Sequence, residues 1–309
     1  MGTSRARIAL GDITKEVGDD QAMLRRVRVA LGEIDKTNEA VGFDISDGRL
    51  AGGVMLDSSV SMRPWYQDGT VQVTTERIAG YFAPIDKTYT LECGYFDTEA
   101  RQVEDLSLRN RAYVGFVNRT VPRLGSTNLY AAILVGVEMA AQALNDKRIL
   151  DYIKPKKTWT GRSTGEWDIP THQLRPLAGA TVYELVIVTD GAPTAGITDP
   201  IKIMELLIRL SYVGIFVKFV YVGNDSAGKK FLQDLDDMDT ARHPKDPRPE
   251  DVDPTTYRGR LPLRYIDNVD KVEIGDPRNA TDEAVAAAMN NELGTYLPSA
   301  VRRGLLTGV

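Results

Sequence analysis

The feature that most constrains the fold is a series of short apolar segments separated by helical patterns. Residues 50–56, 182–188 and 215–222 are almost entirely apolar, and the first two end at Asp57 and at Thr189-Asp190. Apolar runs of this length are typical of strands that are buried on both faces of a sheet. Because helical patterns lie between them, the sequence predicts an α/β fold with a doubly wound, mostly parallel sheet flanked by helices.

The remaining elements are expected to continue this alternation. Near the N-terminus, Met23, Leu24, Val27, Leu31 and Ile34 form an amphipathic stripe that Asp19 or Asp20 can cap. Further helices are expected over 70–82, 106–121, 128–144, 201–210 and 281–297, the last capped by Thr281 or Asp282. Further strands are expected over 89–96, 99–103 and 265–274.

Changes in composition predict four parts of the chain. Residues 1–48 form an N-terminal helical extension, and residues 49–235 form the α/β domain, with an insertion at 145–181. Residues 236–264 are an acidic excursion that is rich in proline, a composition that favours irregular structure. Residues 265–309 supply a strand and a helix that are expected to pack on the α/β domain.

Composition excludes several classes of protein. The 309 residues include one cysteine, Cys93, and two histidines, His172 and His243, which excludes an internal disulfide, a cysteine-cluster metal site and a three-histidine centre. The net charge of −5 gives no basic surface for nucleic acid. No run approaches the roughly 20 apolar residues of a membrane span, and the first residues lack the apolar core of a signal peptide. We therefore expect a cytoplasmic protein, with Cys93 in its core.

Oxygen-bearing side chains gather where the predicted strands end. Asp57, Ser59 and Ser61 follow the first buried strand, Gly125-Ser126-Thr127 opens a predicted helix, and Asp190 follows the second buried strand. Loops at the carboxyl ends of parallel strands converge on one crevice. Carboxylate and hydroxyl oxygens suit a hard divalent cation such as Mg²⁺. The sequence therefore favours a cation site at this edge of the sheet.

These three loops, in this order, resemble the von Willebrand factor A (vWA) domain. Residues 62–66, 69–72, 76–77 and 95–100 resemble more closely the TerF type of this domain, known from bacterial tellurium-resistance operons and actinobacterial phages. The resemblance covers about residues 50–225 and implies a metal-ion-dependent adhesion site that binds Mg²⁺, or Mn²⁺ or Ca²⁺. Its ligands would be Asp57, Ser59, Ser61, Thr127 and Asp190.

The resemblance also implies a function that is not enzymatic. It implies a protein-interaction module in which an Asp or Glu of a partner protein completes the coordination of the cation, in a tellurite-stress or phage setting. A rim of Arg63, Trp65, Tyr66, Asn128 and Tyr130 would supply partner specificity. One residue departs from the family pattern, since Val60 stands where the family usually has glycine. Because a β-branched residue resists backbone angles that glycine tolerates, we expect a slightly reshaped loop.

Other interpretations stay open. The chain can be a structural or assembly subunit with an idle metal site, and a metal-dependent hydrolase is disfavoured because these loops carry no convincing general base. The acidic run Asp234–Asp239 lacks the glycine and terminal glutamate of a calcium loop, so a solvated turn is expected. Residues 154–157 with Trp159 and Trp167 form either a partner patch or a local apolar cluster.

Overall fold

A central sheet organises the molecule. The computed structural model describes residues 11–309 except 47, 87, 120–124, 159–162, 192, 195–199, 239–266 and 275–278. The strands of the main sheet are β1 (Leu50–Asp57), β2 (Thr90–Phe96), β3 (Ala100–Gln102), β4 (Leu106–Ser107), β7 (Val182–Thr189), β8 (Ile215–Tyr221) and β9 (Val269–Glu273). They follow the order β3-β2-β1-β7-β8-β9, with β4 also paired to β2. Strands β1, β2, β7, β8 and β9 are parallel, and β3 and β4 run antiparallel to β2, which confirms the predicted fold class.

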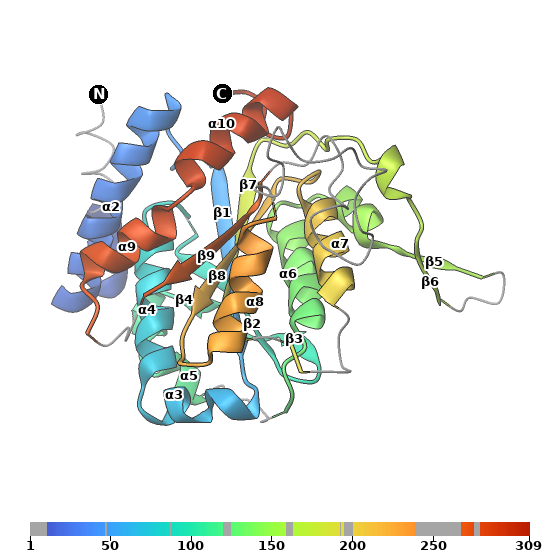
Figure 1. Cartoon of the computed structure of the whole chain (residues 1–309). Helices are drawn as coiled ribbons and strands as arrows, with labels where there is room; N and C mark the ends of the chain where they lie inside the picture. The colour runs from blue at the N-terminus through green and yellow to red at the C-terminus, as the bar shows by residue number, and fades with distance from the viewer. Residues whose placement is uncertain are drawn as a thin grey trace.

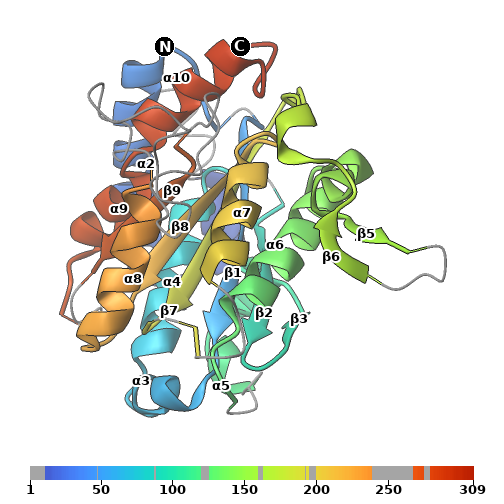
Figure 2. The ribbon, with the colours of Figure 1, turned by 45° about the vertical axis from the view of Figure 1, so that its right-hand side comes forward.

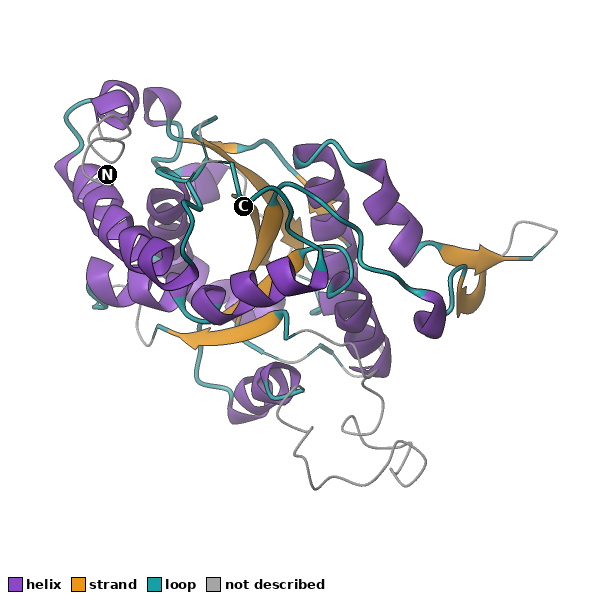
Figure 3. Cartoon of the chain, turned by 90° about the horizontal axis from the view of Figure 1, so that it is seen from above, coloured by secondary structure: helices purple, strands orange, loops and turns teal. Residues whose placement is uncertain are grey.

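Helices cover both faces of this sheet, as Figure 3 shows from above. Their bounds are α2 (Gln21–Val41), α3 (Arg63–Gln67), α4 (Thr70–Phe82), α5 (Phe116–Arg119), α6 (Leu129–Ala143), α7 (Pro200–Leu210), α8 (Ser226–Asp236), α9 (Asp282–Asn290) and α10 (Leu293–Arg303). Helices α2, α4, α9 and α10 share one apolar core with the sheet, and α6, α7 and α8 share the other (Figures 1 and 2). Consecutive residues of β1 alternate between these cores, with Val54 and Leu56 in the first and Met55 in the second. Burial on both faces is the reason that the sequences of β1, β7 and β8 are almost entirely apolar.

The order in which strands are added to the sheet reverses between β1 and β7, which themselves run parallel. From β1 the chain adds β2 and β3 on one side, then returns to place β7 on the other side of β1. In open α/β sheets a binding crevice forms at such a switch point, at the carboxyl ends of the strands. Asp57 ends β1 and Thr189 ends β7, so both lie at this point.

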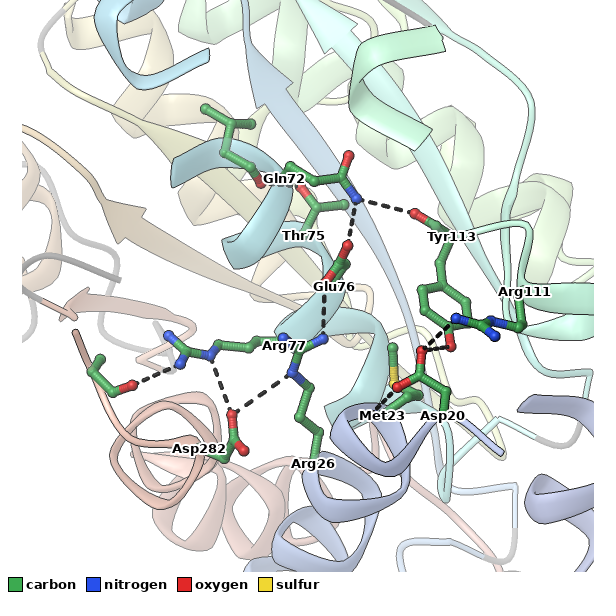
Figure 4. Close-up of polar contacts among 12 residues, drawn as sticks. Asp20, Met23, Arg26, Gln72, Thr75, Glu76, Arg77, Arg111, Tyr113 and Asp282 are labelled. Carbon is green, nitrogen blue, oxygen red and sulfur yellow. Dashed lines mark hydrogen bonds and ion pairs between the residues drawn. The ribbon is translucent and has the colours of Figure 1, made fainter. Parts of the chain in front are cut away.

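Polar contacts join helices α2 and α9, which are distant along the chain, to α4 (Figure 4). Asp282 of α9 lies 3.7 Å from Arg26 of α2 and 3.3 Å from Arg77 of α4. Arg26 also forms an ion pair of 2.9 Å with Glu76 of α4. The hydroxyl of Tyr113 donates to Asp20, whose other oxygen caps α2 as predicted. These half-buried contacts join α2, α4 and α9 into one layer.

Two predicted helices differ in the structure. The expected helix over 106–121 is wrong, because Leu106 pairs with Leu91 in the sheet and, of the described residues 106–119, only 116–119 are α-helical. Asn110, Arg111 and Gly115 have positive φ angles, which a continuous α-helix does not accept. The expected helix over 281–297 is two helices that break at Glu292, whose φ is 60°. Thr281 caps α9 as predicted, and α8, with Asp225 as its cap, was not predicted.

Part of the insertion stands away from the body. Strands β5 (Pro155–Lys157) and β6 (Ser163–Trp167) form a two-stranded sheet that projects to the side in Figures 1 and 2. At its base the guanidinium of Arg209 lies 4.5 Å from the ring centre of Trp167, which packs against the second core. Trp167 therefore belongs to a local apolar cluster, whereas Trp159 lies outside the described residues.

Three further expectations concern the acidic run, membrane spans and Cys93. Asp234 and Asp236 belong to α8, so the acidic run begins in a helix, and Asp239 and His243 lie outside the described residues. No helix in the described part of the chain combines the length and the apolar character needed to cross a membrane. Cys93 is fully buried, as expected.

Candidate metal centre

Asp57 lies at the switch point where β1 and β7 end, the edge at which parallel sheets form a binding crevice, and is fully buried. Its Oδ1 accepts a hydrogen bond of 2.8 Å from the amide of Ser59, and its Oδ2 accepts one of 2.6 Å from the hydroxyl of Thr189. The hydroxyl of Tyr66 donates to the carbonyl of Asp57 at 2.9 Å. Burial raises the pKa of Asp57 to about 7, with a further increase from the charge of Asp190, against the hydrogen bonds from Thr189 and Ser59.

A chain of hydroxyls connects the first loop to Asp190. Ser59 Oγ lies 3.0 Å from Ser61 Oγ, and Ser61 Oγ donates to Asp190 Oδ1 at 3.0 Å. Asp190 is 9% exposed, and its pKa is raised, first by burial and further by the charge of Asp225. The structure thus brings four of the five predicted ligands, Asp57, Ser59, Ser61 and Asp190, into one connected group.

Neither buried carboxylate has a cationic partner within the described residues. The ion pairs among the described residues involve other acids, and Asp57 and Asp190 take part in none of them. Burying an uncompensated carboxylate is costly, so the native state either protonates one acid or pairs it with a cation. The raised pKa values of both acids express the same cost.

The second loop contacts both of the others through its backbone. The carbonyl of Gly125 accepts the amide of Val60 at 2.9 Å, and residues 59 and 125 form a parallel bridge. The amide of Thr127 donates to the hydroxyl of Thr194 at 3.0 Å, and the carbonyl of Thr127 accepts the amide of Thr194. Thr127 is 5% exposed. The fifth predicted ligand therefore lies in a loop that is tied to the first and third loops.

Val60 does not require the conformational freedom of glycine. It begins a short 3₁₀ turn (Val60–Met62) and is not among the described residues with positive φ. Its side chain is 60% exposed, so the β-branched group meets no crowding. A helical backbone angle is allowed for valine, and the departure from the family pattern carries no steric cost in this loop.

The five predicted rim residues differ in how free they are. Tyr66 supports the Asp57 carbonyl, and Asn128 caps α6 by accepting the amide of Ala131 at 3.1 Å. Trp65 packs against the first core and Tyr130 against the second, each with part of its surface exposed. Arg63 alone among the five has an exposed side chain.

Sequence reasoning missed two supporting residues. Thr189 holds Asp57, and its position next to Asp190 was the available signal. Gly223 packs so closely that a Cβ atom would lie 2.9 Å from the Cβ of Asp190, and its φ of 149° also favours glycine. No local pattern in the sequence indicates that contact, because it joins two loops that are distant along the chain.

A second acidic group lies elsewhere. Carboxylate oxygens of Asp236, Asp270 and Glu292 lie within 4.8 Å of one another. These acids already have partners, because Asp270 forms an ion pair of 2.7 Å with Lys218 and Asp236 accepts the amide of Lys271. Existing partners make this group a poorer candidate for a cation than the crevice.

Residues 49–157 match the family model described as the vWA found in the TerF C terminus. Solved structures similar to this chain include the manganese-loaded TRAP protein of Plasmodium vivax, with 12% identity over 78% of this chain and 74% of that chain and a TM-score of 0.41. The SpRpn10 VWA domain is 14% identical over 77% of this chain and 93% of that chain, with a TM-score of 0.37. The pilus adhesin SpaC of Lactobacillus rhamnosus GG is 11% identical over 82% of this chain and 30% of that chain, with a TM-score of 0.38. No curated protein matches the chain.

Proposed function

We propose, starting from a vWA domain related to the TerF type, that the crevice binds a divalent cation and through it a partner protein. Asp57, Ser59, Ser61, Thr127 and Asp190 would hold the cation, directly or through water, with Mg²⁺ the first candidate and Mn²⁺ or Ca²⁺ the alternatives. An Asp or Glu of the partner would complete the coordination. We place this function in the cytoplasm, in tellurite stress or in phage biology, as part of the same proposal; the family model itself names only TerF.

One observation carries this proposal. Two buried carboxylates, Asp57 and Asp190, are joined by Ser61 and Ser59 and have no Lys or Arg partner in the part of the chain that the structure describes. Hydroxyl and carboxylate oxygens are the donors that hard divalent cations prefer, so the donor set fits Mg²⁺. A bound cation would remove the cost of holding both acids ionised.

The residues of the chain have separate tasks in this function. Asp57 and Asp190 supply two negative charges, and Ser59, Ser61 and Thr127 supply neutral oxygens. Thr189 and Tyr66 fix Asp57 through hydrogen bonds of 2.6 and 2.9 Å, so the first carboxylate does not need to be ordered on binding. A bound cation supplies a positive charge for a partner carboxylate, and in a partly dry crevice such a contact is stronger than in water.

The test is calorimetric titration of Mg²⁺ and Mn²⁺ into chelator-treated protein. We expect saturable one-site binding that is lost in Asp57→Ala and in Asp190→Ala. Asp35→Ala is the matched control, because Asp35 is an exposed acid on α2 and its removal changes the net charge by the same amount. Unchanged binding in both site variants, or no binding to the native chain at millimolar metal, would refute the metal site. The second result would favour an assembly subunit with an idle site.

A further inference from the structure

A cavity lies directly beside the proposed metal loop. Its volume is about 330 Å³, within the range of roughly 300–1,000 Å³ that is usual for ligand pockets. Two of its lining residues belong to the metal loops, since Ser58 lies between Asp57 and Ser59, and Gly125 bridges to Ser59. The other lining residues come from the end of β2, the turn that follows it and the start of β3: Tyr95, Phe96, Asp97, Thr98, Glu99, Ala100 and Arg101.

The cavity joins an apolar part to an acidic wall. Tyr95 and Phe96 are buried, whereas Glu99 is exposed and Asp97 half-buried. Asp97 Oδ1 accepts the amide of Glu99 at 3.0 Å, which fixes the turn, and both acids are among the residues that line the cavity. Among the described ion pairs of the molecule, none involves Asp97 or Glu99. Both charges are therefore available to a ligand.

One cation, Arg101, also lines the cavity. It is exposed on β3 and forms no described ion pair with either acid. Two carboxylates and one guanidinium leave the lining with a net negative charge. A positively charged group is therefore the favoured occupant, and Arg101 weakens its binding. An aliphatic stem that ends in a charge suits a cavity of this composition, because the stem can cover the aromatic residues while the charged end reaches the acids.

We propose that this cavity is a subsite for a Lys or Arg side chain of the partner. This inference rests on the proposed function, because the basic residue would lie near the partner's metal-binding Asp or Glu in sequence. The cation site then selects an acid, and the cavity selects a base beside it. Partner recognition would thus require an acidic residue with a basic neighbour.

The test uses acetylated, amidated pentapeptides with a central Asp, flanked by Lys, Ala or Glu on one side or the other. Binding to the full chain saturated with Mg²⁺ is measured by the competition of each peptide against a fluorescent Lys-Asp peptide. We expect the best Lys peptide to bind roughly tenfold more tightly than its Ala counterpart, the difference usual for one charge-assisted contact. Glu peptides should bind more weakly than Ala peptides.

Three variants sharpen the test. Glu99→Gln should abolish the preference for Lys and leave the affinities for Mg²⁺ and for the Ala peptide unchanged. Arg101→Ala should strengthen the Lys preference, because it removes the opposing charge. Glu104→Gln is the matched control, since Glu104 is an exposed acid close in sequence that does not line the cavity.

The possible failures are distinguishable. Metal-dependent binding of all Asp peptides without a Lys preference would overturn the subsite and leave the proposed function standing. A preference for Glu peptides that is lost in Arg101→Ala would also overturn it, because the cavity would then be an anion subsite. Binding of Mg²⁺ without binding of any peptide would refute the partner-carboxylate function and the subsite together.

Discussion

Replacing Glu184 with glutamine should make the protein more stable than the native chain at neutral and alkaline pH. Glu184 lies in the middle of β7 and is fully buried, and neither carboxylate oxygen has a hydrogen-bond partner among the described residues. Its nearest cation is Lys218 Nζ at 3.8 Å, too long for a hydrogen bond. Lys218 already bonds Asp270 Oδ2 at 2.7 Å and the carbonyls of Ala288 and Asn291. The charge of Glu184 is therefore poorly compensated.

Burial raises the pKa of Glu184 from 4.5 to about 8, and the charge of Asp270 adds to this, against the attraction of Lys218. Tyr81 of α4 faces the same carboxyl, which raises the pKa of the tyrosine further. The native state therefore keeps a proton that the unfolded chain releases, so the free energy of unfolding falls as the pH rises from 4.5 to about 8 and is level above. At about 1.4 kcal/mol per pH unit, the loss is on the order of 5 kcal/mol.

Glutamine copies the shape of the protonated acid and cannot ionise, so the difference between Glu184→Gln and the native chain should grow over the same pH window. Urea denaturation at pH 5, 6, 7, 8 and 9 measures it. Near pH 5 the two proteins should have similar unfolding free energies, and at pH 9 the variant should be more stable by a few kcal/mol. The exposed Glu104→Gln variant is the control and should follow the native chain throughout. Parallel curves for Glu184→Gln and the native chain would refute the reasoning.

Three further predictions concern other parts of the fold. Val60→Gly should keep its Mg²⁺ affinity in calorimetry and lose roughly 0.5–1 kcal/mol of stability, because glycine only adds freedom to a loop that valine already fits; a large change in affinity would contradict this. Arg209→Met should lower stability by about 1–3 kcal/mol and expose the insertion to proteolysis, because two carbonyls of the insertion lose their donor; an unchanged digestion pattern would count against that anchor. Gly53→Ala should destabilise the protein by roughly 1–3 kcal/mol in thermal unfolding, because its Cβ would lie 2.1 Å from the Tyr183 hydroxyl. Gly32→Ala, in open space on α2, should stabilise it by up to about 1 kcal/mol. Equal effects of the two variants would show that packing does not decide the outcome.

The central sheet and its long helices were predictable because each has a strong local pattern. Strands β1, β7 and β8 are almost entirely apolar, since both of their faces are buried, and the helix over 70–82 was predicted with the bounds that the structure has. The segment 106–121 failed because its backbone is set by turns at Asn110 and Gly115, which apolar spacing does not reveal. Helix α8 was missed because only Gly228, Leu232 and Leu235 of its residues are buried, too few for a clear stripe.

The candidate site was predictable to the extent that its residues follow strands. Asp57 is the last residue of β1 and Asp190 directly follows β7, so the rule for parallel sheets placed them at one edge. The cavity beside them could not be predicted, because it depends on how the antiparallel turn after β2 lies against Ser58 and Gly125. Such contacts between distant loops have no periodic signal in the sequence.

The terminal segments determine which side of the sheet remains open to a partner. Helices α2, α9 and α10 pack with α4 over one face, and α6, α7 and α8 cover the other. At the amino-terminal edge of the sheet the last residues of the chain are held in place, since Arg49 donates to the carbonyls of Ala180 and Thr307. The C-terminus accordingly lies at the opposite end of the molecule from α3 (Figure 1).

The carboxyl edge has a different surface. Among the large apolar side chains of the described residues, Val60 is the most exposed, at 60%, and it lies between the two serines of the metal loop. Arg63 is exposed three residues later, and the cavity with Asp97 and Glu99 adjoins the loop at Ser58. An exposed apolar group beside unpaired charges is a composition that partner surfaces share. The proposed partner surface would therefore lie at the edge that holds the two buried acids.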